Sequence, residues 1–211
     1  MINAVKVKNL TVVLADGDFP RRGGKAWEAL LAAKRVIACD GAAAAYKRRF
    51  SRWPDYIVGD LDSLSSPPDF AIEMSSDEEN DLSKALSFCR AHLWNDIVIV
   101  GATGKREDHT IANIFIALDA SLPILTDCGV FYPVEGEAVL RAEKGTGVSV
   151  FAPSPTTQMT SKGLVWPLDG VKFRNFYCAA SNRASSTKIS LTSSERVFVF
   201  IASKEKARRK K

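Results

Sequence analysis

Short apolar runs alternate with helix-like stretches along residues 10–126, and this alternation leaves very few architectures open to the chain. Apolar runs predict strands at residues 10–15, 35–39, 56–58, 97–100 and 123–126. The spacing and composition of the stretches between them predict helices at residues 25–34, 42–49, 80–93 and 108–118. Strands linked by helices form a parallel sheet with helices on both faces. We therefore expect a doubly wound, mainly parallel α/β domain over residues 1–132.

The chain changes character at about residue 133, and no helix is predicted from there to residue 203. Short β-rich segments, separated by Gly, Pro, Ser and Thr, lie at residues 139–141, 148–152, 164–166, 188–191 and 197–201. This pattern favours a small antiparallel β-sandwich or barrel, and we expect a β-sandwich domain over residues 133–203. The remaining residues, 204–211 (KEKARRKK), predict a disordered basic tail.

The net charge of +5 points to a nucleic-acid partner only until its distribution is considered. Six of the 29 basic residues and one of the 24 acidic residues lie in the tail, so the rest of the chain carries equal numbers of the two. The excess charge therefore belongs to a solvated end rather than to a binding face. We expect no nucleic-acid partner, and a nucleic-acid-binding protein that uses its tail stays open as an alternative.

The sequence shows no sign of export or of membrane insertion. Its apolar runs are far shorter than the ~18 residues that a membrane span needs, and its first residues lack the apolar region of a secretory signal. We therefore expect a cytoplasmic protein without a membrane partner. Scattered cysteines with hydrophobic neighbours predict buried thiols rather than a disulfide framework or a zinc site: Cys39, Cys89, Cys128 and Cys178.

Acidic residues follow the predicted strands at the points where those strands end. Asp40 follows strand 35–39, Asp60 and Asp62 follow strand 56–58 and a glycine, and Asp81 closes an acidic cluster that opens the next helix. Each acid alone is also typical of a cap or turn. However, ten acidic and four basic residues lie between positions 40 and 81, and ligands bind at the carboxyl ends of parallel strands. Carboxylates gathered there repel one another unless a cation neutralises them, and oxygen ligands without His or Cys favour Mg²⁺ and a polyphosphate substrate.

The strand at 97–100 runs into a glycine-containing, basic loop, residues 101–109 (GATGKREDH). Glycines at a strand-to-helix turn allow close approach of the backbone, and the helix start attracts anions. Lys105 and Arg106 are placed to clamp phosphate oxygens. The loop is neither a Walker P-loop nor a GxGxxG dinucleotide motif, so it indicates a phosphate site of moderate specificity. His109 is interpreted as a residue that orients the loop, with general base as the alternative.

Taken in order, these motifs resemble those of the thiamine pyrophosphokinase family. The matching segments are CDGA at 39–42, PDYIVGDLDSL at 54–64, NDLSKAL at 80–86, GATGKREDHTIANI at 101–114 and SN at 181–182. The resemblance covers nearly the whole chain. It implies transfer of pyrophosphate from ATP to the hydroxyl of thiamine, with Mg²⁺, giving thiamine diphosphate and AMP. It also implies an α/β nucleotide-binding domain, a β-sandwich domain that binds thiamine, and a homodimer.

The resemblance assigns site residues by motif. It implies acidic metal and substrate residues at Asp40, Asp60, Asp62 and Asp81, of which the first three would hold Mg²⁺. It implies ATP-binding residues at Gly104, Lys105, Arg106, Asp108, His109 and Asn113. It implies thiamine-binding residues at Ser181 and Asn182.

Three features depart from the family pattern or leave a role open. Lys105 stands where the family often has a second glycine before the arginine, and it adds a possible phosphate contact. The third acidic motif, usually DxDxTD, has Ser76, Glu78 and Asn80 in its place, so only Asp81 is assigned there. Trp166 is interpreted either as a core residue or as a ring that stacks on thiamine.

A mechanism follows from these charges, because cleavage between the α- and β-phosphates needs charge neutralisation and positioning more than covalent help. Asp81 would orient or deprotonate the thiamine hydroxyl, or coordinate metal, and these roles stay open. The alternative enzyme function is another Mg²⁺-dependent phosphotransferase or nucleotidyltransferase that acts on a small alcohol.

Overall fold

The computed structural model describes residues 8–75 and 79–203. The tail predicted at 204–211 and the positions of Ser76 and Glu78 lie outside these residues. The chain divides into two compact units, one that ends at Asp127 and one that begins at Cys128. Each unit is described by itself below.

The first unit is built on a parallel sheet. Its strands are β1 (Thr11–Leu14), β2 (Arg35–Cys39), β3 (Tyr56–Gly59), β4 (Ile72–Glu73), β5 (Ile97–Val100) and β6 (Ile124–Leu125). They lie in the order β6-β5-β1-β2-β3-β4, and every neighbouring pair is parallel. Fully buried β-branched and aliphatic side chains, such as those of Val13, Ile37 and Ile99, fill both faces of the central strands.

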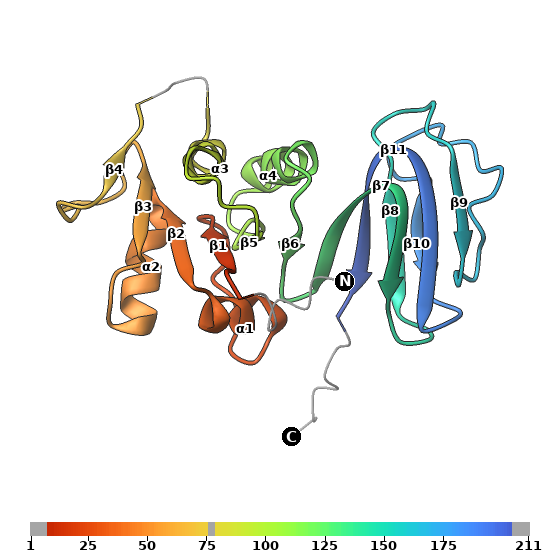
Figure 1. Cartoon of the computed structure of the whole chain (residues 1–211), viewed down its shortest axis with the longest axis horizontal. Helices are drawn as coiled ribbons and strands as arrows, with labels where there is room; N and C mark the ends of the chain where they lie inside the picture. Colours follow the sequence, from red (N-terminus) through yellow and green to blue (C-terminus); the bar gives the residue numbers. More distant parts are fainter. Residues whose placement is uncertain (1–7, 76–78, 204–211) are drawn as a thin grey trace. The chain divides into compact units, whose positions relative to one another are not determined.

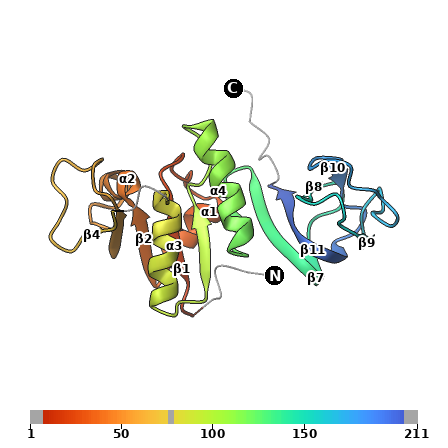
Figure 2. The same ribbon diagram turned by 90° about the horizontal axis from the view of Figure 1, so that it is seen from above.

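Four helices connect and cover this sheet. They are α1 (Lys25–Ala32), α2 (Asp40–Phe50), α3 (Asp81–Ala91) and α4 (Glu107–Asp119). Figures 1 and 2 show α1 and α2 on one face of the sheet and α3 and α4 on the other. Helix α3 forms because its apolar residues recur on one face, and it buries Leu82, Ala85 and Leu86 there. The doubly wound parallel fold predicted from the alternating pattern is confirmed.

The strand order places one topological switch point in this unit. From β1 the chain moves in one direction through β2, β3 and β4, and then returns to β5 on the other side of β1. The connections that follow β1 and β5 therefore leave the sheet side by side and then lead to helices on opposite faces of it. In open α/β sheets the ligand crevice lies outside the carboxyl ends of the strands at such a point.

The second unit is entirely β in its described residues up to 203. Its strands are β7 (Gly129–Arg141), β8 (Gly147–Phe151), β9 (Met159–Lys162), β10 (Ala179–Arg183) and β11 (Lys188–Ala202). A long antiparallel ribbon of β7 and β11 is irregular between Ser193 and Val197. On one side of this irregularity β11 also pairs with β9, and on the other side it pairs with β8, which pairs with β10. The ribbon thus contributes to two layers around one core that includes Val150, Phe173 and Ile189.

Several local expectations differ from the structure. The segments predicted at 188–191 and 197–201 are one continuous strand, β11, because the bulge does not break its pairing with β7. The strand predicted at 164–166 is only an isolated bridge between Leu164 and Ala184. Strands β4, β9 and β10 were not predicted, since they are short or polar. The second unit begins at Cys128 rather than at 133, because residues 129–141 form the single strand β7.

The cysteine prediction is right for two residues and wrong for two. Cys39 and Cys89 are buried in the first unit, whereas Cys128 and Cys178 are exposed. Cys128 immediately precedes β7 and Cys178 lies just before β10, so neither occupies a core-facing position of a strand. Among the described helices, none combines the length and the apolar character that a bilayer crossing requires.

Candidate active site

Three of the predicted acidic residues converge at the carboxyl edge of the parallel sheet. Asp40 begins α2 directly after β2, and Asp60 and Asp62 lie in the turn after β3. Leu61, between the last two, has a positive φ of 66°, so the chain turns sharply there. One carboxylate oxygen from each of the three aspartates lies within 4.8 Å of the other two. This spacing and this donor set fit one divalent cation of the Mg²⁺ type.

Asp40 is the buried member of this group, with an exposed fraction of 0%. Its Oδ2 accepts a hydrogen bond from the Ser63 amide at 2.9 Å, but its Oδ1 is buried and has no hydrogen-bond partner among the described residues. Burial raises the pKa of Asp40, and the charges of Asp81, Asp60 and Asp62 add to the rise. Buried carboxylate oxygens are normally satisfied, so this one is available as a ligand for a cation.

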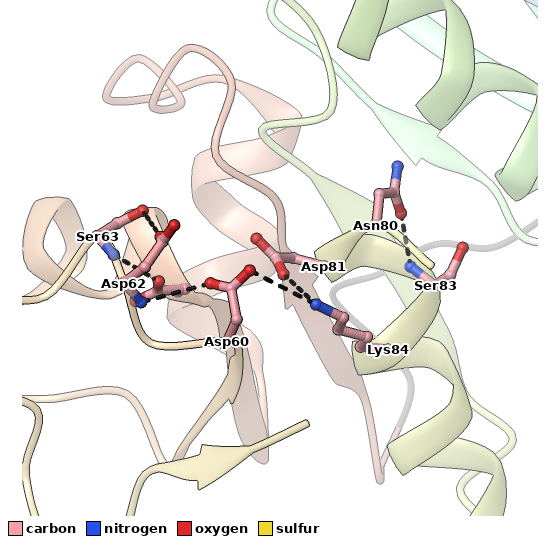
Figure 3. A network of polar contacts seen from close by, with 8 residues as sticks. Asp60, Asp62, Ser63, Asn80, Asp81, Ser83 and Lys84 are labelled. Carbon is pink, nitrogen blue, oxygen red and sulfur yellow. Dashed lines mark hydrogen bonds and ion pairs between the residues drawn. The ribbon is translucent and has the colours of Figure 1, made fainter. Parts of the chain in front are cut away.

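Lys84 lies on the other side of Asp60 and was not predicted as a site residue. Its Nζ lies 3.7 Å from Asp60 Oδ2 and 3.4 Å from Asp81 Oδ1, and its side chain is only 3% exposed. Figure 3 shows the ammonium group pointing between the two carboxylates. Burial raises the pKa of Asp81, and the Lys84 charge opposes that rise. The available signal was the i,i+3 spacing of Asp81 and Lys84, which places both on one face of α3.

Two residues fix the positions of Asp40, Asp60, Asp62 and Asp81, which together form the acidic edge of the sheet. Gly59 ends β3, and a Cβ there would lie 2.7 Å from the Asp40 Cβ and 3.3 Å from Asp81 Oδ1. Only glycine therefore lets β3 pass so close to both acids. Asn80 caps α3 by accepting a hydrogen bond from the Ser83 amide at 2.9 Å, which orients the first turn that carries Asp81 (Figure 3).

The predicted phosphate loop follows β5 at the same edge of the sheet. Gly101 and Gly104 have positive φ angles of 66° and 84°, and Lys105 shares this conformation with a φ of 57°. Lys105 Nζ lies 2.7 Å from Asp16 Oδ1, and Arg106 pairs with Asp108 at 2.6 Å. The hydrogen bonds from Arg106 lower the pKa of Asp108 to about 2. Both cations are thus presented at the surface in fixed positions.

The other two residues assigned to this loop differ in exposure. His109 is exposed in the first turn of α4. Asn113 is buried, where its Nδ2 donates to the Ala102 carbonyl at 3.2 Å and its Oδ1 accepts from Asn80 at 3.4 Å. Asn113 therefore ties the loop to the start of α3, which is a positioning role.

The residues predicted for thiamine lie in the second unit, and the side chain of Asn182 forms hydrogen bonds with the backbone there. Asn182 is 5% exposed; its Oδ1 accepts hydrogen bonds from the amides of Trp166 and Arg183, and its Nδ2 donates to the Trp166 carbonyl at 2.7 Å. Ser181 is exposed, and its amide donates to Ser149 Oγ at 3.0 Å. Trp166 is 57% exposed, so its interpretation as a core residue is wrong. Trp166 and Asn182 both line an open pocket of about 170 Å³.

Two segments of the chain match described protein families. Residues 26–125 match "Thiamin pyrophosphokinase, catalytic domain", and residues 129–200 match "Thiamin pyrophosphokinase, substrate-binding domain". Among curated proteins, Thiamin pyrophosphokinase 1 of Caenorhabditis elegans is 28% identical over 108 residues. This match covers 44% of the present chain and 44% of that relative, so it spans less than half of the relative's length.

Solved structures share the fold at low sequence identity. A thiamin pyrophosphokinase from Candida albicans superposes with a TM-score of 0.78 at 18% identity, covering 95% of this chain and 90% of that one. The yeast thiamin pyrophosphokinase superposes with a TM-score of 0.75 at 14% identity, covering 92% of this chain and 86% of that one. The thiamine pyrophosphokinase from Bacillus subtilis superposes with a TM-score of 0.73 at 17% identity, covering 93% of this chain and 100% of that one. The two matched domains together account for most of the sequence, and the chain therefore belongs to the thiamin pyrophosphokinase family.

Proposed function

We propose that this protein transfers a pyrophosphoryl group from ATP to the hydroxyl of thiamine, giving thiamine diphosphate and AMP, in a Mg²⁺-dependent reaction. The observation that carries the proposal is the convergence of Asp40, Asp60 and Asp62 around a buried oxygen that has no hydrogen-bond donor among the described residues. Membership of the family supplies the substrate, because both matched domains are described as parts of thiamin pyrophosphokinase.

The acidic edge and the basic loop at residues 101–109 would contact different parts of Mg·ATP. Mg²⁺ held by Asp40, Asp60 and Asp62 would neutralise charge on the triphosphate. Lys105 and Arg106 would bind phosphate oxygens and stabilise the charge on the group in transfer. The other residues assigned to the nucleotide shape or flank this loop: Gly104, Asp108, His109 and Asn113.

Asp81 is assigned to the thiamine hydroxyl rather than to the metal. Lys84 lies between Asp81 and Asp60, within 3.4 Å and 3.7 Å of their oxygens, and Asp81 is not among the three aspartates that converge. A half-buried carboxylate whose pKa is raised by burial is a better proton acceptor for an alcohol than a fully solvated one. Asp81 would therefore orient the hydroxyl and accept its proton.

The second unit would hold thiamine near Ser181, Asn182 and Trp166, and the active protein would be a cytoplasmic homodimer. The pocket that Trp166 and Asn182 line measures about 170 Å³. Small-molecule sites typically enclose about 300–1,000 Å³. A pocket smaller than this range is consistent with a site that a second copy of the chain completes.

One assay tests the reaction. The purified protein is mixed with Mg·ATP and thiamine, and the products are separated by chromatography. We expect AMP and thiamine diphosphate in equal amounts, and little of either with Asp62→Asn, which keeps the shape of the side chain but loses its charge. Formation of ADP and thiamine monophosphate would instead identify a different phosphotransferase, and no thiamine product at all would refute the proposal.

A further inference from the structure

The turn that follows β1, Asp16-Gly17-Asp18, lies against the basic loop at the switch point and has no role in the function proposed above. The Gly17 amide donates to the Gly101 carbonyl at 2.6 Å, and the Asp18 amide donates to the Thr103 carbonyl at 2.7 Å. These bonds continue the pairing of β1 with β5 beyond the ends of both strands. The turn and the loop are thus held together by their backbones.

Glycine is required on both sides of this contact. A Cβ on Gly17 would collide with the Thr103 and Gly101 carbonyl oxygens, and a Cβ on Gly104 would collide with the Asp18 carboxylate. The two segments are therefore packed at backbone distance, and the acidic turn cannot shift away from the loop without breaking the hydrogen bonds between them.

Within this rigid frame, the Asp16 carboxylate holds the Lys105 ammonium. Asp16 Oδ1 and Lys105 Nζ are 2.7 Å apart, and both side chains are about half exposed, at 47% and 49%. The Asp16 carboxylate also lies over the start of α2, where a Cβ on Gly41 would be 2.6 Å from its Oδ2. The amino end of a helix favours a negative charge, so Asp16 is stabilised from a second side.

Lys105 itself has an unusual backbone for its residue type. Its φ of 57° is a conformation that favours glycine, and a side chain there costs about 1 kcal/mol or more. The chain nevertheless carries a long cationic side chain at this position. The contact with Asp16 gives that side chain a fixed direction, toward the switch point between β1 and β5.

We propose that Asp16 is a positioning residue for ATP binding: it holds the Lys105 ammonium at the switch point, so that the remaining N–H bonds of the ammonium meet phosphate oxygens. This inference rests on the proposed function, since it takes the basic loop to be the ATP-phosphate loop. A free lysine side chain loses about 2 kcal/mol of rotamer entropy when it is fixed. Asp16 imposes that order before ATP arrives, and the loss of Asp16 therefore weakens ATP binding without affecting thiamine.

A double-mutant cycle tests the proposal by calorimetric binding of Mg·ATP and by steady-state kinetics. Asp16→Asn should raise the Kd and the KM for ATP by about two- to fivefold, the range expected for one half-exposed ion pair, and Lys105→Met, which also loses the phosphate contact, should raise both by at least as much. The double variant should be no weaker than Lys105→Met alone, since Asp16 acts through Lys105. The KM for thiamine should stay unchanged throughout. Asp96→Asn removes the same charge at the opposite edge of the sheet, just before β5, and should leave ATP binding unaltered.

The outcomes separate the two proposals. If the wild-type protein neither binds Mg·ATP nor makes thiamine diphosphate, the proposed function fails and this inference fails with it. If the wild-type protein is active, three results overturn the role of Asp16 alone. These are an unchanged or lower KM for ATP in Asp16→Asn, effects of the two substitutions that simply add, or a fall in kcat at unchanged KM, which would place Asp16 on the reacting groups.

Discussion

Asp40, Asp60 and Asp62 were predictable as a group because the fold that places them follows from the sequence. Carboxyl ends of parallel strands meet at one edge of the sheet, so acids that follow such strands must come together. Lys84 and Asp16 were not predictable in the same way. Lys84 is a site residue because it lies 3.7 Å from Asp60, and Asp16 is one because it lies 2.7 Å from Lys105. In both pairs the partner belongs to a distant segment, so the contact depends on side-chain packing rather than on the order of elements.

The substitution Lys84→Met tests the balance of charge inside the acidic edge. Lys84 lies within 3.7 Å of Asp60 and 3.4 Å of Asp81, and in the proposed function it would compete with Mg²⁺ for Asp60. Its removal should lower the Mg²⁺ concentration that gives half-maximal activity, because the edge becomes more negative, and it should lower kcat, because Asp81 loses its partner. Activity measured across a Mg²⁺ titration gives both values. A higher Mg²⁺ requirement with an unchanged kcat would contradict this role, and Lys84→Arg, which keeps the charge, should restore part of the kcat.

At the scale of elements, the central strands and the four helices of the first unit were predictable because their patterns are strong. Mainly apolar runs predicted β1, β2 and β5, of which β5 is apolar throughout, and apolar spacing predicted α3. The misses share a physical cause. Strand β10 (AASNR) has little apolar pattern, and it is a strand because β8 pairs with it. The continuity of β11 across its bulge depends on β7, which the local sequence does not encode.

Gly59 ends β3 beside Asp40 and Asp81, and Gly59→Ala should lower both the stability and the activity of the protein. The added Cβ would meet the Asp40 Cβ at 2.7 Å, and this neighbour is the root of a buried side chain that cannot swing away. We expect a loss of about 1–3 kcal/mol in the free energy of unfolding, together with a loss of activity. The matched control is Gly147→Ala in β8, where the nearest atom would be 3.6 Å away. That control should change stability by less than about 0.5 kcal/mol when both are compared by denaturant titration. Equal stabilities for the two variants would contradict the close packing at Gly59.

Strand β10 presents Asn182, whose three hydrogen bonds hold the backbone of Trp166 and Arg183. Asn182→Ala removes all three and frees the segment that carries Trp166. We expect the KM for thiamine to rise several-fold more than the KM for ATP, which is bound by the other unit in the proposed function. Steady-state kinetics with each substrate varied in turn measures both constants. An unchanged KM for thiamine would show that neither Asn182 nor the position of Trp166 contributes to this site.

At the scale of the whole molecule, the chain pairs a parallel α/β unit, whose carboxyl edge is acidic, with an all-β unit that supplies a separate pocket. The division was visible in the sequence because helical spacing stops at about residue 133 and the part that follows is richer in serine and threonine. The function of the second unit was not, since its polar residues are spread over short strands and turns. Its assignment to thiamine depended on the resemblance to a family and on the match of residues 129–200.

Without a bound cation, the buried carboxylate of Asp40 and the half-buried carboxylate of Asp81 should lower the free energy of unfolding. Burial raises the pKa of both Asp40 and Asp81 above the ordinary value of 3.8, so in the absence of cation these groups destabilise the fold more as pH rises from about 4 through their raised pKa values. A cation that binds only the folded state removes this cost. At a Mg·ATP concentration 100 times its Kd the gain is about 2.7 kcal/mol, or roughly 5–10 °C in Tm for a chain of this size. Thermal melts at neutral pH in EDTA and in saturating Mg·ATP measure the difference, and Asp62→Asn, which weakens the cation site, should show much less of it. If the Tm of the wild-type protein is the same in both conditions, the acidic edge is not a Mg·ATP site.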